Sequence, residues 1–237
     1  MIVDEGPLSR RPARSLFRYA KLRRLFPGDL DKLTNSGIAR LCVLFEDLRI
    51  EIAGLSLPRP SLKDERGLAA GFDVAGHELR SFYFLRRSIA TCVEFAEAIR
   101  LLDQASDFKK LVARFPAEGQ TTWRESLNYF GRKEKFWKEI RNDVGGHFGS
   151  KASEFAVESF LPDAGGSIEV HLNHDGKGGA ILGFASEIAA TALLRRLPGG
   201  THKEKSKNLI DEVMTAFPHA IRAVECIVND HMWDRAG

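Results

Sequence analysis

Cysteine is scarce in this chain, whose 237 residues include only Cys42, Cys92 and Cys226. The three are odd in number, far apart and set in apolar segments with helical periodicity. This distribution excludes a disulfide framework and a zinc site built on closely spaced cysteines. We expect three reduced thiols, as in a protein of the cytoplasm.

Long apolar runs are also missing. The most apolar stretch, residues 179–194, contains Glu187 and has amphipathic spacing, so no segment is predicted to span a membrane. The first residues lack the apolar core of a secretory signal. The composition, 43% hydrophobic and 28% charged, is typical of a globular protein. We expect this protein in the cytoplasm, without a membrane partner.

A strong net charge is lacking too, since the formal charge at pH 7 is only +3. Basic residues nevertheless concentrate in two places. Residues 10–24 contain seven lysines and arginines and no acid, and residues 132–141 contain five against two glutamates. Both segments suit a nucleic-acid path. A solvated arm and an ordinary charged helix face are the alternative explanations.

Apolar residues recur at three- and four-residue steps through most of the chain, which predicts a mainly α-helical fold. Ser106 and either Thr121 or Thr122 are expected to be N-caps, and Pro218 is expected to kink the last helix. The expected helices cover residues 38–55, 73–104, 106–115, 122–144, 151–160, 185–197 and 210–227.

One segment, residues 167–184, has a different pattern. Apolar and polar residues alternate at its start and a glycine-rich turn follows, which predicts a small β-hairpin. We therefore expect three parts in the chain. They are a basic N-terminal arm in residues 1–34, a helical bundle in residues 35–160, and a hairpin with two helices in residues 161–237 that pack on the bundle or complete it.

The most informative motif is Arg141-Asn142-Asp143-Val144-Gly145-Gly146-His147, at the end of a predicted helix. The arginine fork suits phosphate oxygens, and histidine exchanges protons near neutral pH. In a straight helix Arg141 and His147 would be about 600° apart in rotation, on different faces. Gly145 and Gly146 accept backbone angles that end a helix, which would let His147 swing towards Arg141.

The order of these residues, arginine, a polar residue, four intervening positions and histidine, resembles the motif of the HEPN superfamily. That superfamily consists of helical bundles, many of them metal-independent endoribonucleases of toxin–antitoxin and antiviral defence systems. The resemblance implies that Arg141 and His147 are catalytic and that Asn142 supports them. It also implies a homodimer, in which two motifs share one cleft, and a possible antitoxin protein as partner.

The mechanism that the resemblance implies needs no cofactor. The RNA 2′-hydroxyl attacks the adjacent phosphate while His147 accepts or donates the proton and Arg141 stabilises charge on the phosphate oxygens. Asn142 positions the phosphate or the other two side chains. The products would be a 2′,3′-cyclic phosphate and a 5′-hydroxyl.

Several neighbouring residues are candidates for supporting roles. Glu46 and Glu94, on the first two long helices, are candidates for orienting His147 or holding Arg141, although ordinary helix-face acids are the alternative. The spacing of Trp123 and Trp137 predicts core positions. Candidates for RNA contact are the basic residues and the one tyrosine expected at the surface, where it would stack on bases: Arg132, Lys135, Lys138 and Tyr129.

Two other patterns do not support a ligand site. His171 and His174 belong to residue types that bind metals, but no further cluster with ligand spacing accompanies them, so no metal site is expected. Residues 176–179 are glycine-rich but lack the spacing of a phosphate-binding loop. The leading hypothesis is therefore a metal-independent endoribonuclease. The alternative is a catalytically silent helical module that binds a protein or nucleic acid, with Arg141 paired to a carboxylate and His147 in a helix C-cap.

Overall fold

The computed structural model describes most of the chain between Ala20 and Arg235. The described residues are 20–57, 68–144, 150–160, 168–172, 178–182, 184–195, 197–198, 200–233 and 235. The elements in chain order are α1 (Leu22–Leu25), α2 (Lys32–Leu55), α3 (Leu68–Gln104), α4 (Ser106–Val112), α5 (Ala117–Val144), α6 (Ser150–Glu158), β1 (Ile168–Leu172), β2 (Gly178–Leu182), α7 (Phe184–Leu194), α8 (His202–Ile227) and the π-helical turn η1 (Val228–Met232).

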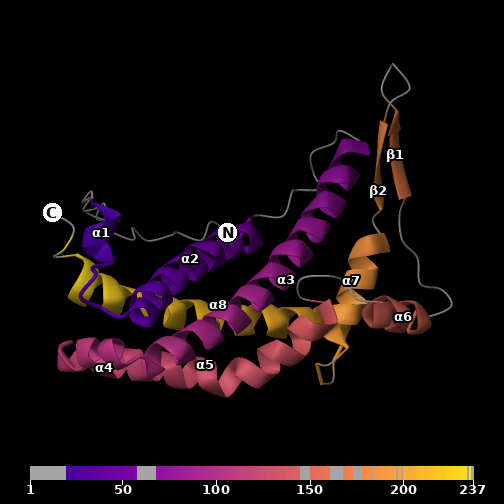
Figure 1. Cartoon of the computed structure of the whole chain (residues 1–237). Helices are drawn as coiled ribbons and strands as arrows, with labels where there is room; N and C mark the ends of the chain where they lie inside the picture. The colour runs from indigo at the N-terminus through magenta and orange to yellow at the C-terminus, as the bar shows by residue number, and fades with distance from the viewer. Residues whose placement is uncertain are drawn as a thin grey trace, which may run out of the picture.

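The protein is mainly α-helical, and its long helices form a bundle, as the periodicity predicts. Helix α3 packs on α2 and on α5, while α8 packs on α5, α2 and α3. Figure 1 shows these four helices as the long rods of the molecule. One hydrophobic core joins residues of α2, α3, α5, α6, α7 and α8, so the helices after residue 161 share the core of those before it.

Helix α2 begins where its first backbone amides find an acceptor. The Asp31 carboxylate accepts a hydrogen bond of 2.6 Å from the backbone N–H of Thr34, an N-cap that the apolar pattern does not reveal. Helix α3 starts at Leu68, before the expected residue 73. Leucine and alanine, which open α3, have high helix propensity but leave no amphipathic stripe to detect.

Two predicted helix starts are wrong. Helix α4 has Ala105 as its N-cap, so Ser106 is its first residue and not its cap. Helix α5 begins at Ala117, directly after Pro116, and not at Thr121 or Thr122. The Thr121 hydroxyl donates to the carbonyl oxygen of Ala117 at 2.9 Å, as an interior helical threonine does.

Helix α8 is closed at its start by a capping box. The Thr201 hydroxyl accepts from the backbone of Glu204, whose carboxylate accepts from the backbone of Thr201. The helix continues through Pro218 to Ile227. Phe217, one residue before that proline, stacks with Phe45 of α2 at a centroid distance of 6.3 Å.

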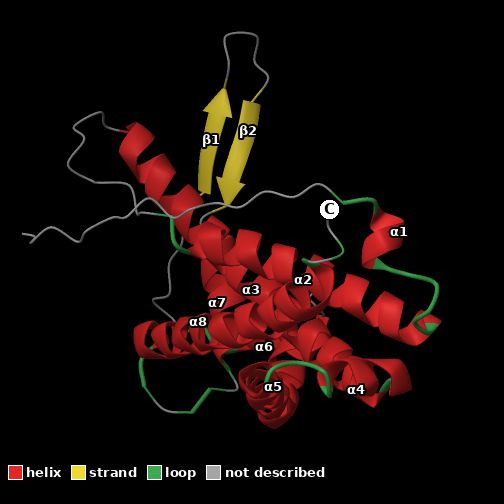
Figure 2. Ribbon diagram, turned by 90° about the vertical axis from the view of Figure 1, so that its left-hand side faces the viewer, coloured by secondary structure: helices red, strands yellow, loops and turns green. Residues whose placement is uncertain are grey.

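Two short strands pair antiparallel in the part of the chain before α7. Ile168 of β1 pairs with Leu182 of β2, and Leu172 with Gly178. Figure 2 shows the strand pair projecting from the bundle at the same end as the start of α3. Helix α6 packs mainly on α7, and α7 contacts α3, α5 and α8.

The three cysteines are free, as expected, with Cys92 and Cys226 buried and Cys42 half-buried. Burial raises the pKa of each thiol, so all three are neutral at pH 7. Within the described ranges, no helix is long and apolar enough to cross a membrane.

A glycine allows close approach between α2 and α3. A Cβ added at Gly54 would lie 2.4 Å from the ring of Phe84, whereas one added at Gly131 of α5 would meet no atom within 4 Å. Overpacking of this kind typically costs about 1–3 kcal/mol. We expect Gly54→Ala to lower the free energy of unfolding by about that amount in urea titrations.

The matched change Gly131→Ala is expected to raise the free energy of unfolding by up to about 1 kcal/mol, because alanine favours helix over glycine. An equal gain in stability at both positions would contradict the close α2–α3 contact.

Candidate functional site

The first half of the predicted motif lies in the last turn of α5. That helix buries one face completely, including Trp123, Phe130 and Trp137, as the spacing predicts for the two tryptophans. Arg141 follows the buried Ile140 and is half-buried, while Asn142 is exposed. The core packing of α5 therefore fixes the backbone from which both motif side chains extend.

The side chain of Arg141 makes no hydrogen bond or ion pair with another described residue. Its pairing with a nearby carboxylate, the alternative explanation of this arginine, is thus not found in the described parts of the chain. A cation in the last helical turn also interacts favourably with the helix dipole. No described carboxylate therefore occupies the guanidinium of Arg141.

Helix α5 ends at Val144, directly before Gly145 and Gly146, and α6 begins at Ser150. Residues 145–149, which include both glycines and His147, lie outside the described residues. Helix α6 packs on α5 and α7, so the helices on both sides of the motif are anchored to the bundle. The helix stop that the paired glycines predict falls on residues outside the described ones.

The two candidate carboxylates have other neighbours. Glu46 accepts from Arg49 at 2.7 Å, an exposed pair one turn apart on α2. Glu94 is exposed on α3 and contributes to the raised pKa of Glu51. Among the described residues neither carboxylate contacts Arg141. The structure therefore shows neither carboxylate holding Arg141, and the alternative role of orienting His147 lies outside the described residues.

The basic residues of α5 differ in whether a nearby carboxylate neutralises their charge. Lys138 pairs with Glu134 at 2.6 Å, and Lys135 lies 4.0 Å from Glu139 with most of its side chain exposed. Arg132 is exposed and has no carboxylate partner among the described residues. Of the three candidates for RNA contact, Arg132 is thus the one whose charge is least compensated.

Tyr129 is not at the surface, so its predicted role in stacking on RNA bases is wrong. Its exposed fraction is 6%, and its hydroxyl donates to the backbone oxygen of Glu212 in α8 at 3.5 Å. Its ring stacks on the imidazole of His219, with centroids 4.1 Å apart and an interplanar angle of 14°. Burial raises the pKa of Tyr129, as expected for a phenol packed between two helices.

The structure shows a buried carboxyl in α2 that the sequence does not predict. Glu51 is 5% exposed, accepts from the Thr91 hydroxyl at 3.0 Å and lies 3.6 Å from the Arg87 side chain. Burial raises the pKa of Glu51 to about 7, against the opposing effects of Thr91 and Arg87. A single glutamate on a helix carries no sequence signal that separates it from a surface acid.

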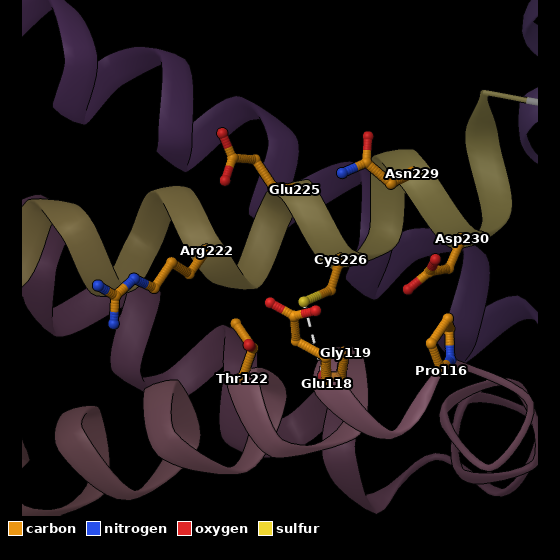
Figure 3. Close-up of a pocket in the computed structure, with 9 residues that line it drawn as sticks. All are labelled: Pro116, Glu118, Gly119, Thr122, Arg222, Glu225, Cys226, Asn229 and Asp230. Atoms are coloured by element: carbon orange, nitrogen blue, oxygen red, sulfur yellow. Dashed lines mark hydrogen bonds between the residues drawn. The ribbon is translucent and has the colours of Figure 1, made fainter.

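A polar cavity of about 550 Å³ lies between the start of α5 and the end of α8, and Figure 3 shows its lining. The Cys226 thiol donates to the backbone oxygen of Gly119 at 3.6 Å, and burial raises the pKa of this thiol to about 11. Cys226 is therefore a poor nucleophile at neutral pH. In the described parts of the chain, no group of three His, Cys, Asp or Glu residues is arranged to hold a metal ion.

Comparisons with known proteins identify no relative of this chain. No protein-family model, no curated protein and no solved structure matches the chain.

Proposed function

We propose that this protein is a HEPN-like, metal-independent endoribonuclease that acts in the cytoplasm in a toxin–antitoxin or antiviral defence setting. The observation that carries the proposal is the position of Arg141. It is a guanidinium without a described carboxylate partner, in the last turn of a helix that ends at Val144, three positions before His147.

In the proposed reaction each of the three motif residues has one task. Arg141 binds the phosphate oxygens and stabilises the charge that grows on them during attack. His147 transfers a proton between the 2′-hydroxyl and the leaving 5′-oxygen, while Asn142 positions the phosphate or the other two side chains. The products are a 2′,3′-cyclic phosphate and a 5′-hydroxyl.

The proposal includes a homodimer. Arg141 lies in α5 and His147 follows it in the sequence before α6, and a second copy of the chain would bring a second pair to the same cleft. A protein antitoxin that covers the exposed side of Arg141 and Asn142 would block the site.

Incubation of total RNA with purified protein in EDTA tests the proposal. We expect the wild type to cut the RNA and the Arg141→Ala/His147→Ala variant to leave it intact. Arg124→Gln is the matched control, because it removes one arginine charge from an exposed position of the same helix. Intact RNA with the wild type, or equal cutting by the double variant, would favour a silent binding module.

A further inference from the structure

A second cavity, also of about 550 Å³, lies between the middle parts of α5 and α8 and is lined by Glu125, Asn128, Arg132 and His219. The three α5 residues follow one another at steps of three and four, so they share one face of the helix. Along α5, Arg132 and Arg141 are about 900° of rotation apart and hence project from opposite sides. This cavity is therefore distinct from the motif at the end of α5.

His219 forms one wall of the cavity, and its ring is held in position by a buried neighbour. Its ring stacks on Tyr129, which the core holds in place, and its Nδ1 is buried without a hydrogen-bond partner among the described residues. Burial lowers the pKa of His219, and the charges of Arg222 and Arg132 act in the same direction, while Glu125 opposes them. At neutral pH the imidazole is thus uncharged, with one ring nitrogen a donor and the other an acceptor, and the buried Nδ1 is not the nitrogen that a ligand in the cavity reaches.

Two arginines bring positive charge to this surface from different helices. Arg132 lines the cavity. Arg222, which lines the polar cavity of Figure 3, lies three residues after His219 on the same helix, and its charge acts on His219. Both are exposed and lack a carboxylate partner within the described ranges. Figure 3 shows the guanidinium of Arg222 turned away from Glu225 and Asp230. Exposed, unpaired guanidinium groups are suited to phosphate, whose oxygens accept two parallel hydrogen bonds from one fork.

The remaining polar groups restrict the kind of phosphate compound that fits. Glu125 lines the same cavity and would repel a bare phosphate. The Glu125 carboxylate is instead an acceptor for a hydroxyl group, and the Asn128 amide both donates and accepts. A ligand that carries hydroxyl donors next to a phosphate matches this combination of groups.

We propose that the cavity binds the ribose phosphate of a nucleotide. Arg132 and Arg222 hold the phosphate oxygens, Glu125 accepts from a ribose hydroxyl, and Asn128 and the neutral His219 complete the hydrogen bonds. A free ribonucleotide and an RNA strand both present this chemistry. The site uses neither Arg141 nor His147, so it does not depend on the proposed cleavage activity.

Calorimetric titration with adenosine 5′-monophosphate, inorganic phosphate and a single-stranded RNA decamer tests the site. The decamer is titrated in the Arg141→Ala/His147→Ala background, so that it stays uncut. We expect Arg132→Gln and Arg222→Gln each to weaken binding of the nucleotide about tenfold or more, the usual effect of losing a charged hydrogen bond. Arg124→Gln, which removes the same charge outside the cavity, is expected to leave the Kd unchanged.

The titrations with the nucleotide and with the RNA decamer distinguish the two sources of ribose phosphate. Similar affinities for nucleotide and decamer would identify a free nucleotide as the ligand, and much tighter binding of the decamer with the same dependence on Arg132 and Arg222 would identify RNA. In the wild type, the imidazole resonances of His219 should shift when the nucleotide is added. Absence of binding by both probes, an unchanged Kd in both the Arg132→Gln and the Arg222→Gln variant, equal weakening by Arg124→Gln, or His219 resonances that do not move would each overturn the proposal.

Discussion

Replacing Arg141 by alanine is expected to lower the rate of RNA cleavage by about 10²- to 10³-fold, the usual cost of losing one group that stabilises developing charge. The reason is that Arg141 lies in the last turn of α5 and has no carboxylate partner among the described residues. A phosphate is therefore the anion that we propose it binds. Arg141→Lys keeps the charge but loses the planar fork, so we expect an intermediate rate. The measurement is the initial rate of cleavage of a labelled RNA in EDTA.

The structure also predicts that this loss is not caused by unfolding. Arg141 is half-buried and outside the hydrophobic core, so the variant should unfold at nearly the same urea concentration as the wild type. Cleavage by Arg141→Ala within a few-fold of the wild-type rate would remove the arginine from the proposed mechanism. A loss of equal size in Arg124→Gln would show that only the overall charge matters.

The free energy of unfolding is expected to fall by roughly 2–3 kcal/mol between pH 5 and pH 8 because of Glu51. The pKa of this buried carboxyl is raised from 4.5 to about 7 in the folded state. The folded protein therefore holds the proton more tightly than the unfolded chain. This stabilisation is fully present below pH 4.5 and is lost as the pH rises through about 7. Urea unfolding at a series of pH values measures the effect.

Glu51→Gln isolates this contribution, because glutamine keeps an acceptor for the Thr91 hydroxyl but does not ionise. We expect the variant to lose most of the decline between pH 5 and pH 8. Glu139→Gln, at an exposed position of α5, should retain the wild-type decline. A decline in Glu51→Gln as steep as that of the wild type would show that Glu51 is not the group responsible.

The sequence predicts the buried face of α5 well, since a helix that packs on one side repeats its apolar residues at the helical period. The spacing predicts Trp123 and Trp137 in the core, and their side chains are 1% and 0% exposed. The periodicity does not predict the start of α5 because residues 117–121 contain no apolar stripe, although Pro116 marks the boundary. Apolar periodicity predicts which residues of a helix are buried, but it does not predict the residue at which the helix begins.

Contacts between distant segments explain the failures at Tyr129 and Glu51. Tyr129 lies beside the apolar stripe of α5, on a second face that becomes buried only because α8 packs there. Glu51 resembles any helix-face acid until α3 covers it. His219 gains its surroundings from α5 in the same way, and no local pattern marks it.

The sequence predicts part of the candidate site. The apolar periodicity predicts a helix that contains Arg141, and the structure shows Arg141 close to the last described residue of α5. The compensation of Lys138 by Glu134 also follows from their spacing of one helical turn. The lack of a described partner for Arg141 does not, because it depends on which helices lie near the end of α5.

The chemical ends of the RNA fragments test the central claim most directly. RNA would be incubated with the purified protein in EDTA, and the fragments would be analysed by mass spectrometry beside those from the Arg141→Ala/His147→Ala variant. The proposed attack by the 2′-hydroxyl predicts 2′,3′-cyclic phosphate and 5′-hydroxyl ends that appear only with the wild type. Fragments with 3′-hydroxyl and 5′-phosphate ends, or cyclic phosphates formed equally by the double variant, would contradict it.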